Sequence, residues 1–356
     1  MPQAPQISHV RRAESEIQLA ILPTQGVCGM EDNMKIVVLD AYPLKKEYDN
    51  NMEKFEKLGE MILYDKTSPE QTKDRLEEHN PEIIITNKVL LNEEVLKNIT
   101  NLKLIVESAT GFDNVDVEYA KSRNIAVSNV AGYSTDSVAQ HTFAMYFYVM
   151  EHLRYYDDYV KSGEYSKISG LCQLPEKFTE ISGKTWGIIG LGAIGRKVAQ
   201  IATAFGAEVI YYSASGRTYD SPYKCIDLDT LLKESDIISI HAPLNDKTYD
   251  LINMDAFEKM KKSAILINVG RGSIVNEADL TVALEEGKIL AAGLDVLSKE
   301  PIEVDNPLNR IKDSSKLLIT PHMAWGADDA KNHLVDGVYE DITAYLNGEL
   351  KNRVDL

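Results

Sequence analysis

The chain has 356 residues, of which 44% are hydrophobic, and a formal net charge of −17. This length favours two domains, because one hydrophobic core rarely grows beyond about 250–300 residues, and the composition excludes disordered and collagen-like chains. No apolar run reaches the roughly 20 residues that cross a bilayer, and the acidic balance argues against nucleic acid or membrane partners, because it repels phosphates and anionic lipids.

Residues 1–33 differ in character from the rest of the chain. They have no long apolar core and carry several acidic residues, which argues against a signal or transit peptide. We therefore expect an N-terminal extension that ends where Met34 opens an apolar run.

From Met34 onwards, short runs rich in Ile, Val and Leu alternate with amphipathic stretches. Runs that are apolar on both faces are typical of parallel strands buried on both sides. Because each run is followed by a stretch long enough for a crossover helix, the pattern predicts an α/β fold with two doubly wound parallel sheets. The first sheet is expected from residues 35–40, 60–65, 82–86, 102–108 and 125–129, and the second from 185–190, 208–213, 236–241, 264–270, 290–296 and 316–320.

Two helical stretches separate these sets. Residues 132–160 are expected to form one long helix, capped by Ser134 or Thr135. A polar stretch follows to Gly183, before the second sheet begins. A last helix over residues 326–348 is expected to return to the first domain.

A glycine-rich turn, GLGAIG, follows the first strand of the second sheet and opens a helix. Gly190 suits the tight turn, Gly192 allows the backbone to approach a pyrophosphate, and Gly195 allows close packing of helix on strand. The backbone N–H groups of Ala193 and Ile194 then point at the phosphates from the positive end of the helix. The turn predicts a dinucleotide site.

The next strand ends without the carboxylate that usually binds a free ribose 2′-hydroxyl. Ser213, Ser215 and Arg217 occur there instead, and two hydroxyls and a guanidinium suit a 2′-phosphate. This favours NADP slightly, but a serine also serves NAD and Arg217 also fits a solvated loop, so the preference stays open.

Three polar residues follow successive predicted strands of the second sheet, namely Arg271, Glu300 and His322. In open α/β folds such strand ends bind ligands. Arginine holds a carboxylate bidentately, histidine gives a proton to a carbonyl oxygen that receives a hydride, and a carboxylate behind the imidazole fixes its orientation and favours its charged form. The trio predicts reduction of a 2-oxo acid.

The three cysteines, Cys28, Cys172 and Cys225, are scattered and have no metal-ligand spacing. We therefore expect reduced thiols, a cytoplasmic protein and no metal site.

Seven motifs carry a resemblance to a known family: ATGFDNVD (109–116), NVAGYSTDSVAQHTFAM (129–145), GLGAIG (190–195), HAPL (241–244), LINVGRGSIVNEADL (266–280), GLDVLSKEP (293–301) and TPHMAW (320–325). From Met34 to the C-terminus the chain resembles the D-isomer-specific 2-hydroxyacid dehydrogenases. The resemblance implies a discontinuous, flavodoxin-like substrate-binding domain (34–131 and 323–356), a Rossmann nucleotide-binding domain (132–322) and a homodimer.

The resemblance also implies roles for individual residues. Arg271 matches the family's substrate arginine, Glu300 its supporting acid and His322 its general acid/base, while Asp295 matches a contact to the nicotinamide carboxamide. Further positions along the cofactor are His241, Ala242, Pro243, Thr248, Val269 and Gly270.

The first domain contributes candidates for substrate binding. The turn of Thr110 and Gly111 is expected to offer backbone N–H groups to the substrate carboxylate, and Asn87 and Lys88 are candidates for the same site. A solvated loop charge is the alternative for Lys88, and turn geometry alone also explains Gly111.

Within the family, the motifs look most like the glycerate dehydrogenase branch, which reduces hydroxypyruvate and glyoxylate. Two alternatives stay open. One is a D-lactate-type dehydrogenase, although Ala324 and Trp325 stand where that type tends to have an aromatic pair. The other is a dinucleotide-sensing, corepressor-like dimer, against which the lack of basic patches argues.

Overall fold

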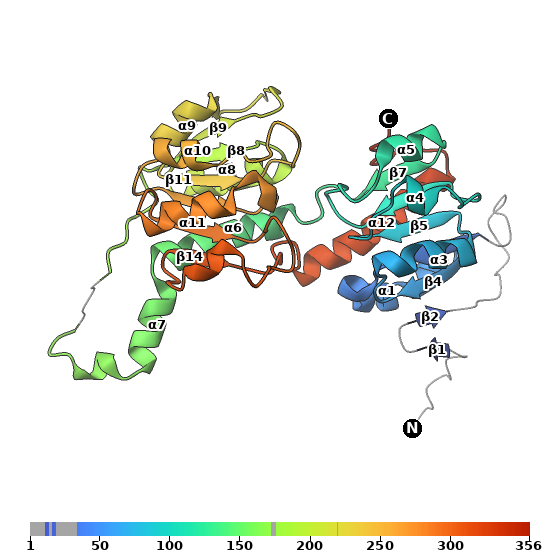
Figure 1. The fold of residues 1–356 in the computed structure, drawn as a ribbon, viewed down its shortest axis with the longest axis horizontal. Helices are drawn as coiled ribbons and strands as arrows, with labels where there is room; N and C mark the ends of the chain where they lie inside the picture. The colour runs from blue at the N-terminus through green and yellow to red at the C-terminus, as the bar shows by residue number, and fades with distance from the viewer. Residues whose placement is uncertain (1–10, 14–15, 19–33, 172–175, 219) are drawn as a thin grey trace. The chain divides into compact units, whose positions relative to one another are not determined.

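The computed structural model describes residues 11–13, 16–18, 34–171, 176–218 and 220–356 (Figure 1). It divides into two compact units, one of Met1–Tyr133 with Asp328–Leu356 and one of Ser134–Ala327. Each unit has its own seven-stranded sheet, and all eleven predicted strands are present. The expected fold class, two doubly wound parallel sheets, is confirmed.

The unit boundaries differ slightly from those expected. The second unit begins at Ser134 rather than 132 and ends at Ala327 rather than 322. The later end has a physical cause, because the backbone N–H groups of Met323 and Ala324 donate to the carboxylate of Asp295 in the second unit.

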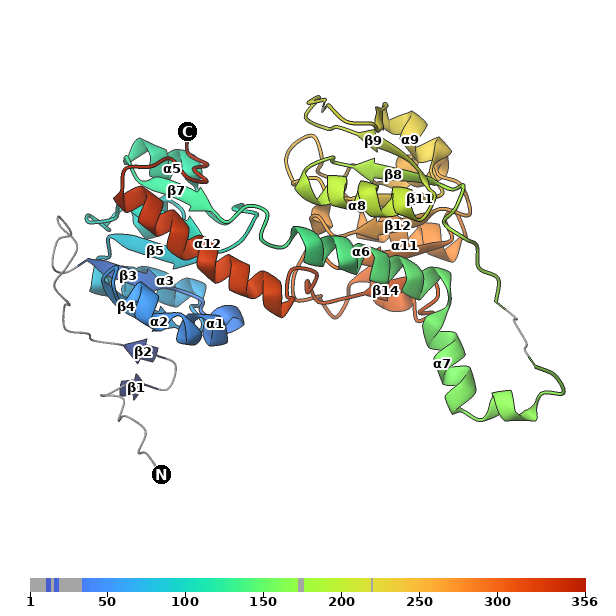
Figure 2. The same cartoon turned by 180° about the vertical axis from the view of Figure 1, so that it is seen from behind.

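The sheet of the first unit has the order β1-β2-β4-β3-β5-β6-β7. Strands β3 to β7 are parallel, as Ile- and Val-rich runs buried on both faces predict. Helices α3, α4 and α5 cover one face, and α1 and α12 pack together on the other (Figure 2). The bounds are β3 Lys35–Val38, β4 Glu60–Tyr64, β5 Ile83–Thr86, β6 Leu104–Glu107, β7 Ala126–Asn129, α1 Lys45–Asn50, α2 Met52–Phe55, α3 Pro69–His79, α4 Glu93–Leu96, α5 Val117–Ser122 and α12 Asp328–Leu346.

Two short strands at the N-terminus were not predicted. β1 (Arg11–Ala13) and β2 (Glu16–Gln18) pair antiparallel with each other, and β2 pairs with β4. Part of the expected extension therefore continues the sheet, where it pairs the backbone groups of β4 that an edge strand would expose. The remaining residues of 1–33 lie outside the described part of the chain.

The C-terminal residues close the opposite edge of the same sheet. Arg353 forms an antiparallel bridge with Ser128 of β7, and the Asp355 carboxylate accepts a hydrogen bond from the backbone N–H of Val127 at 2.9 Å. The sheet of the first unit is therefore built from both ends of the described chain.

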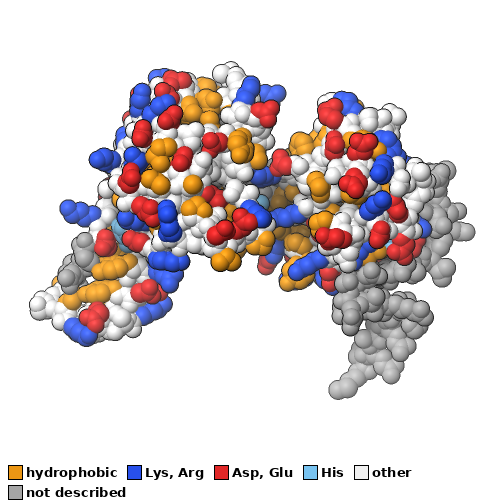
Figure 3. All heavy atoms as spheres, viewed as in Figure 1, with side chains coloured by type: hydrophobic (Ala, Val, Ile, Leu, Met, Phe, Trp, Pro, Cys, Tyr) orange, Lys and Arg blue, Asp and Glu red, His pale blue; other side chains and the backbone are white. Residues whose placement is uncertain are grey.

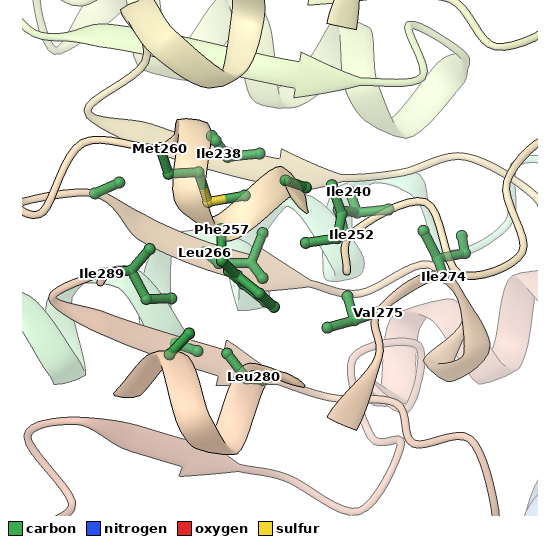
Figure 4. Close-up of a cluster of buried hydrophobic side chains, with 14 of the residues drawn as sticks. Ile238, Ile240, Ile252, Phe257, Met260, Leu266, Ile274, Val275, Leu280 and Ile289 are labelled. Carbon is green, nitrogen blue, oxygen red and sulfur yellow. The ribbon is translucent and has the colours of Figure 1, made fainter. Parts of the chain in front are cut away.

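The sheet of the second unit has the order β10-β9-β8-β11-β12-β13-β14 and is parallel throughout. Helices α6 and α8 cover one face, and α9, α10 and α11 cover the other, where Ile238, Phe257 and Leu266 belong to a buried cluster (Figure 4). The bounds are β8 Thr185–Ile189, β9 Glu208–Tyr212, β10 Lys224–Cys225, β11 Ile237–Ile240, β12 Ile265–Asn268, β13 Ala291–Leu294, β14 Leu317–Ile319, α8 Ala193–Ala204, α9 Leu228–Glu234, α10 Met254–Lys259 and α11 Glu277–Glu285.

The predicted single helix over 132–160 was wrong. The structure has α6 (Thr135–Met150) and α7 (Leu153–Lys161), separated at His152, whose φ of 51° is left-handed. α6 packs on the sheet, whereas no residue of α7 is buried. Because α7 has no packing on the sheet, nothing keeps it collinear with α6 as one continuous helix. α7 extends away from the sheet of its unit (Figure 1), and hydrophobic side chains reach its surface (Figure 3).

Within the described residues, no helix is long and apolar enough to span a bilayer.

Candidate active site

The glycine-rich turn has the geometry of a dinucleotide site. Gly190 has a φ of 95°, in the left-handed region, and a Cβ on Gly195 would lie 2.2 Å from the Gly190 carbonyl oxygen. At Gly192 the same added Cβ would meet nothing within 4 Å. The turn therefore needs Gly190 and Gly195 for its own packing, while Gly192 keeps open space beside the backbone.

Helix α8 begins directly at this open space. Gly192 is its N-cap and supplies no side-chain hydrogen bond, so the first N–H groups, on Ala193 and Ile194, are not capped by that residue. Such N–H groups and the helix dipole bind phosphate. The residues present therefore fit the pyrophosphate of a dinucleotide.

The turn after β9 lies beside the glycine turn, because the Gly190 N–H donates to the Tyr212 carbonyl oxygen. In it, the hydroxyls of Ser213 and Ser215 lie 3.3 Å apart, and the Arg217 N–H donates to the Ser215 hydroxyl. Arg217 is exposed. This small polar turn has no carboxylate at the strand end.

The segment after β11, which begins at His241, is fixed by hydrogen bonds to buried residues of the second unit. His241 accepts or donates through Nε2 at 2.9 Å from the Ser239 hydroxyl, whose oxygen also accepts from the buried Trp186 indole. Burial lowers the pKa of His241 to about 3, so its ring is neutral at physiological pH. The imidazole is therefore neutral and is held by its bond to Ser239.

The other residues predicted along the cofactor also belong to ordered turns. The hydroxyl of Thr248 donates to the Pro243 carbonyl oxygen at 2.7 Å. Ala242 is buried and touches the glycine turn, since a Cβ on Gly190 would lie 2.8 Å from the Ala242 nitrogen. Gly270, which follows Val269, donates its N–H to Asn268 Oδ1 at 3.0 Å.

The structure brings Glu300 and His322 into direct contact. Glu300 Oε2 lies 2.7 Å from His322 Nδ1, and Glu300 Oε1 accepts from the Leu297 N–H. Because Nδ1 faces the carboxylate, Nε2 of the half-buried imidazole is left for other partners. This is the orientation that a proton donor to substrate requires.

Arg271 lies on a turn that packs against the loop bearing Glu300. A Cβ on Gly272 would lie 1.8 Å from the Leu297 carbonyl carbon, so only glycine allows the two loops to approach this closely. Asn268 fixes the turn by donating to the Arg271 carbonyl oxygen at 2.9 Å. The arginine and the acid–histidine pair thus sit on interlocked loops at the carboxyl ends of β12, β13 and β14.

Asp295 is 1% exposed, and its carboxylate accepts several hydrogen bonds within the unit. The donors are the Thr320 hydroxyl at 2.6 Å and the N–H groups of Met323 and Ala324 at 2.9 Å each. Burial alone would raise the pKa of Asp295, but these bonds and one to His141 hold it below its ordinary value. Asp295 therefore orders the chain on both sides of His322, and its nicotinamide contact stays a prediction.

The candidates of the first unit lie at the carboxyl ends of β5 and β6. Asp40 accepts from the N–H groups of Asn87 and Lys88 at 2.9 and 2.7 Å, and Asn87 Nδ2 donates to the Ser108 carbonyl oxygen at 2.6 Å. Lys88 is exposed. Asn87 thus shapes the loop that precedes Thr110 and Gly111.

That loop is also fixed from the neighbouring strand. Asn129 Nδ2 donates to the Thr110 carbonyl oxygen at 2.6 Å, which holds the turn of Thr110 and Gly111 from behind. Thr110 is exposed and Gly111 half-buried.

Sequence reasoning missed a set of residues that hold the loops of Arg271, Glu300 and His322, namely Ser137, His141, Asn268, Glu277 and Thr320. Glu277 is an example, because its carboxylate accepts from the Ser298 N–H and from Asn306, both on or beside the loop of Glu300. All five positions lie in motifs that the sequence analysis quoted, but no spacing rule gave them a role.

Within the described residues, no group of three or more His, Cys, Asp or Glu side chains is arranged to hold a metal ion.

The glycine turn, the uncapped start of α8 and the acid–histidine pair at the same sheet edge define a dinucleotide-binding oxidoreductase.

Comparison with known proteins specifies the family. Residues 143–324 match the family model described as D-isomer specific 2-hydroxyacid dehydrogenase, NAD binding domain. The chain is 36% identical over 325 residues to a hydroxypyruvate reductase of Blautia hydrogenotrophica (90% of this chain, 100% of that protein). It is 35% identical over 322 residues to a glycerate dehydrogenase of Methylorubrum extorquens (90% and 99%).

A solved structure is also similar to this chain in fold and sequence. An acyclic imino acid reductase in complex with NADPH and D-Arg has 30% identity and a TM-score of 0.80, covering 90% of this chain and 100% of that one. The chain therefore belongs to the D-isomer-specific 2-hydroxyacid dehydrogenases, in the branch that the motifs predicted, and is an oxidoreductase.

Proposed function

We propose that the protein reduces a small 2-oxo acid, with hydroxypyruvate or glyoxylate favoured, to its D-2-hydroxy acid. The observation that carries this proposal is the 2.7 Å contact between Glu300 and His322, on loops interlocked with that of Arg271. The similarity to a hydroxypyruvate reductase and a glycerate dehydrogenase supports the substrate class.

In this proposal each side chain has one task. The Arg271 guanidinium holds the substrate carboxylate, because its fork matches two carboxylate oxygens. A reduced nicotinamide dinucleotide held at the glycine turn of Gly190, Gly192 and Gly195 would supply the hydride that the carbonyl carbon receives. His322 gives its Nε2 proton to the carbonyl oxygen and regains a proton from solvent, while Glu300 accepts the Nδ1–H bond and stabilises the charged ring.

Residues of the first unit are also proposed to bind substrate. Backbone N–H groups at Thr110 and Gly111 would bind the substrate carboxylate, and the hydrogen bonds from Asn87 and Asn129 that fix this turn support the assignment. Lys88 is proposed as a nearby cation, which a protein with a net charge of −17 needs to attract an anionic substrate.

For the cofactor we propose NADP over NAD, by a small margin. The turn of Ser213, Ser215 and Arg217 supports this preference, because it offers hydroxyls and a guanidinium where a carboxylate would repel a 2′-phosphate.

We also propose a homodimer in which α7 of each protomer packs on its partner. Leu153 and Val160 of α7 are 45% and 54% exposed. The same unit has a recess of about 260 Å³ whose lining includes Phe178 and Phe205, so the unit offers both exposed apolar side chains on α7 and a recess with apolar side chains in its lining. Such self-complementarity suits a two-fold interface.

The dimer is tested by light scattering after size-exclusion chromatography. Changing both Leu153 and Val160 to Glu should give monomers, whereas Ser162→Glu beside them should leave the dimer intact. A dimeric double variant would exclude α7 from the interface.

We propose a cytoplasmic location as well, which the exposed free thiol of Cys225 supports, because such thiols are kept reduced there.

Initial rates for hydroxypyruvate, glyoxylate and pyruvate with NADH and NADPH test the function. Turnover that disappears in His322→Ala supports the proposal. Preference for pyruvate would favour the D-lactate type, and tight dinucleotide binding without turnover of any 2-oxo acid would favour a sensor.

A further inference from the structure

One face of helix α6 contacts both ends of the segment that carries the catalytic histidine, residues 320–324, here called the catalytic turn. Ser137 and His141 are four residues apart and so lie on the same face of the helix. The Ser137 hydroxyl donates to the Ala324 carbonyl oxygen. His141 Nε2 lies 3.1 Å from the Thr320 hydroxyl oxygen.

The direction of the bonds at Thr320 follows from its single hydroxyl proton. That proton goes to Asp295 Oδ1, at 2.6 Å, so the Thr320 oxygen accepts from His141, and His141 Nε2 carries a proton. The same Nε2 lies 3.5 Å from Asp295 Oδ1. His141 therefore donates to Thr320 and lies close to Asp295, the other group that holds the start of the turn.

The turn needs such support because its backbone is strained at the catalytic residue. His322 has a φ of 53°, a left-handed conformation that costs a non-glycine residue about 1–3 kcal/mol. Its N–H donates to the Asp295 carbonyl oxygen at 2.8 Å, and the Asp295 carboxylate accepts from the two following residues. This frame holds the backbone of His322, while Glu300 holds its imidazole.

We propose that Ser137 and His141 are positioning residues that clamp the catalytic turn from α6. They touch neither substrate nor cofactor in this assignment and act through Thr320, Asp295 and Ala324. The inference rests on the proposed role of His322, and it assigns a task to a helix face that the reaction itself does not use.

Loss of the clamp should have a different effect on the enzyme from a general loss of fold stability. Losing it lets the imidazole move relative to the carbonyl oxygen, which slows proton and hydride transfer, and a misplacement of about 1 Å can cost roughly 100-fold. Binding of the dinucleotide at the glycine turn does not depend on the clamp. The turnover number should therefore fall while the dissociation constant for the cofactor stays the same.

The test compares four variants of the full-length protein. His141→Leu and Ser137→Ala remove the donors, His141→Gln keeps an N–H donor at the end of the side chain, and Gln140→Leu is the control on the exposed face of α6. Each is assayed for kcat, KM, cofactor binding by fluorescence and the primary isotope effect with a reduced cofactor deuterated at nicotinamide C4.

His141→Leu and Ser137→Ala should each lower kcat by about 10- to 100-fold and raise the isotope effect towards its intrinsic value, with cofactor affinity unchanged. His141→Gln should recover most of the rate, and Gln140→Leu should behave as wild type. A His141→Leu protein that does not fold leaves Ser137→Ala and His141→Gln to decide.

Normal kcat in Ser137→Ala and His141→Leu would overturn the clamp, as would a rate loss matched by an equal loss of cofactor-binding sites, which indicates only a smaller folded fraction. These outcomes differ from failure of the proposed function, in which the wild-type protein itself turns over no 2-oxo acid.

Discussion

Glu300 Oε2 and His322 Nδ1 lie 2.7 Å apart, although 22 residues separate them in the chain. The strands β13 and β14 that lead to their loops are neighbours in the sheet, which places the two side chains at one edge. The carboxylate has a second bond, from the Leu297 N–H, so it is held independently of the histidine. The acid thus orients the imidazole rather than the reverse.

Replacing Glu300 tests this relationship. In Glu300→Gln the carboxylate charge that stabilises the doubly protonated ring is lost, and kcat for reduction should fall by about 10- to 100-fold with little change in cofactor affinity. Single-turnover measurements of reduced cofactor consumption would report it. Glu303→Gln on the same loop is the matched control, and equal rates in the two variants would remove Glu300 from the mechanism.

Two glycines of the dinucleotide turn should respond differently to alanine. Gly192→Ala places a methyl in open space and keeps the fold, but it should raise the Kd for the dinucleotide at least about tenfold, because the methyl occupies the phosphate position. Gly195→Ala meets the Gly190 carbonyl oxygen at 2.2 Å and should lower the free energy of unfolding by about 1–3 kcal/mol.

Calorimetric titration and urea unfolding separate the two effects. If Gly192→Ala binds the dinucleotide as tightly as wild type, the open space beside Gly192 is not the pyrophosphate site.

We expect Arg217 to bind the 2′-phosphate on the ribose of NADPH. Arg217→Ala should raise KM for NADPH by about tenfold or more, since a hydrogen bond to a charged group contributes about 1.5–3 kcal/mol, while KM for NADH changes little. Parallel increases for both cofactors would assign Arg217 to the loop structure alone. Lys224→Ala on the neighbouring β10 is a control that removes a nearby exposed cation.

Stability of the first unit should depend on pH through Asp341 of α12. The Asp341 side chain is buried, and burial raises its pKa to about 6 from 3.8. The folded state therefore holds a proton that the unfolded chain has released, so this group's contribution to stability falls as pH rises from about 4 to 6, by roughly 3 kcal/mol.

Asp341→Asn keeps an oxygen for the bond from Asn352 and cannot ionise. Relative to wild type, this variant should gain unfolding free energy between pH 4 and pH 7, measured by urea denaturation. Asp329→Asn, on the exposed side of α12, should show no such trend. A difference from wild type that does not change with pH would contradict the assignment.

The strands were predictable because each is a run of buried aliphatic residues, as in Ile83–Thr86, and such runs carry their own signal. Strand-end placement likewise predicted that Arg271, Glu300 and His322 lie on neighbouring loops, and their roles in the reaction stay a prediction. The break at His152 was not predictable, since the sequence stays amphipathic across it and only the end of packing on the sheet stops α6. The bond from His141 to Thr320 joins positions 179 residues apart and leaves no local pattern.

The two-part make-up of the first unit has a consequence for biosynthesis. Its parallel strands leave the ribosome first, but α12, which contacts β6 and β7 and buries Leu334, Val338 and Ile342, is translated only after the whole second unit. Domains tend to fold as they emerge, at about 5–20 residues per second. The continuous second unit can thus complete itself during synthesis, while apolar strands made earlier wait some ten seconds or more for their cover and are the segment that a chaperone would need to shield.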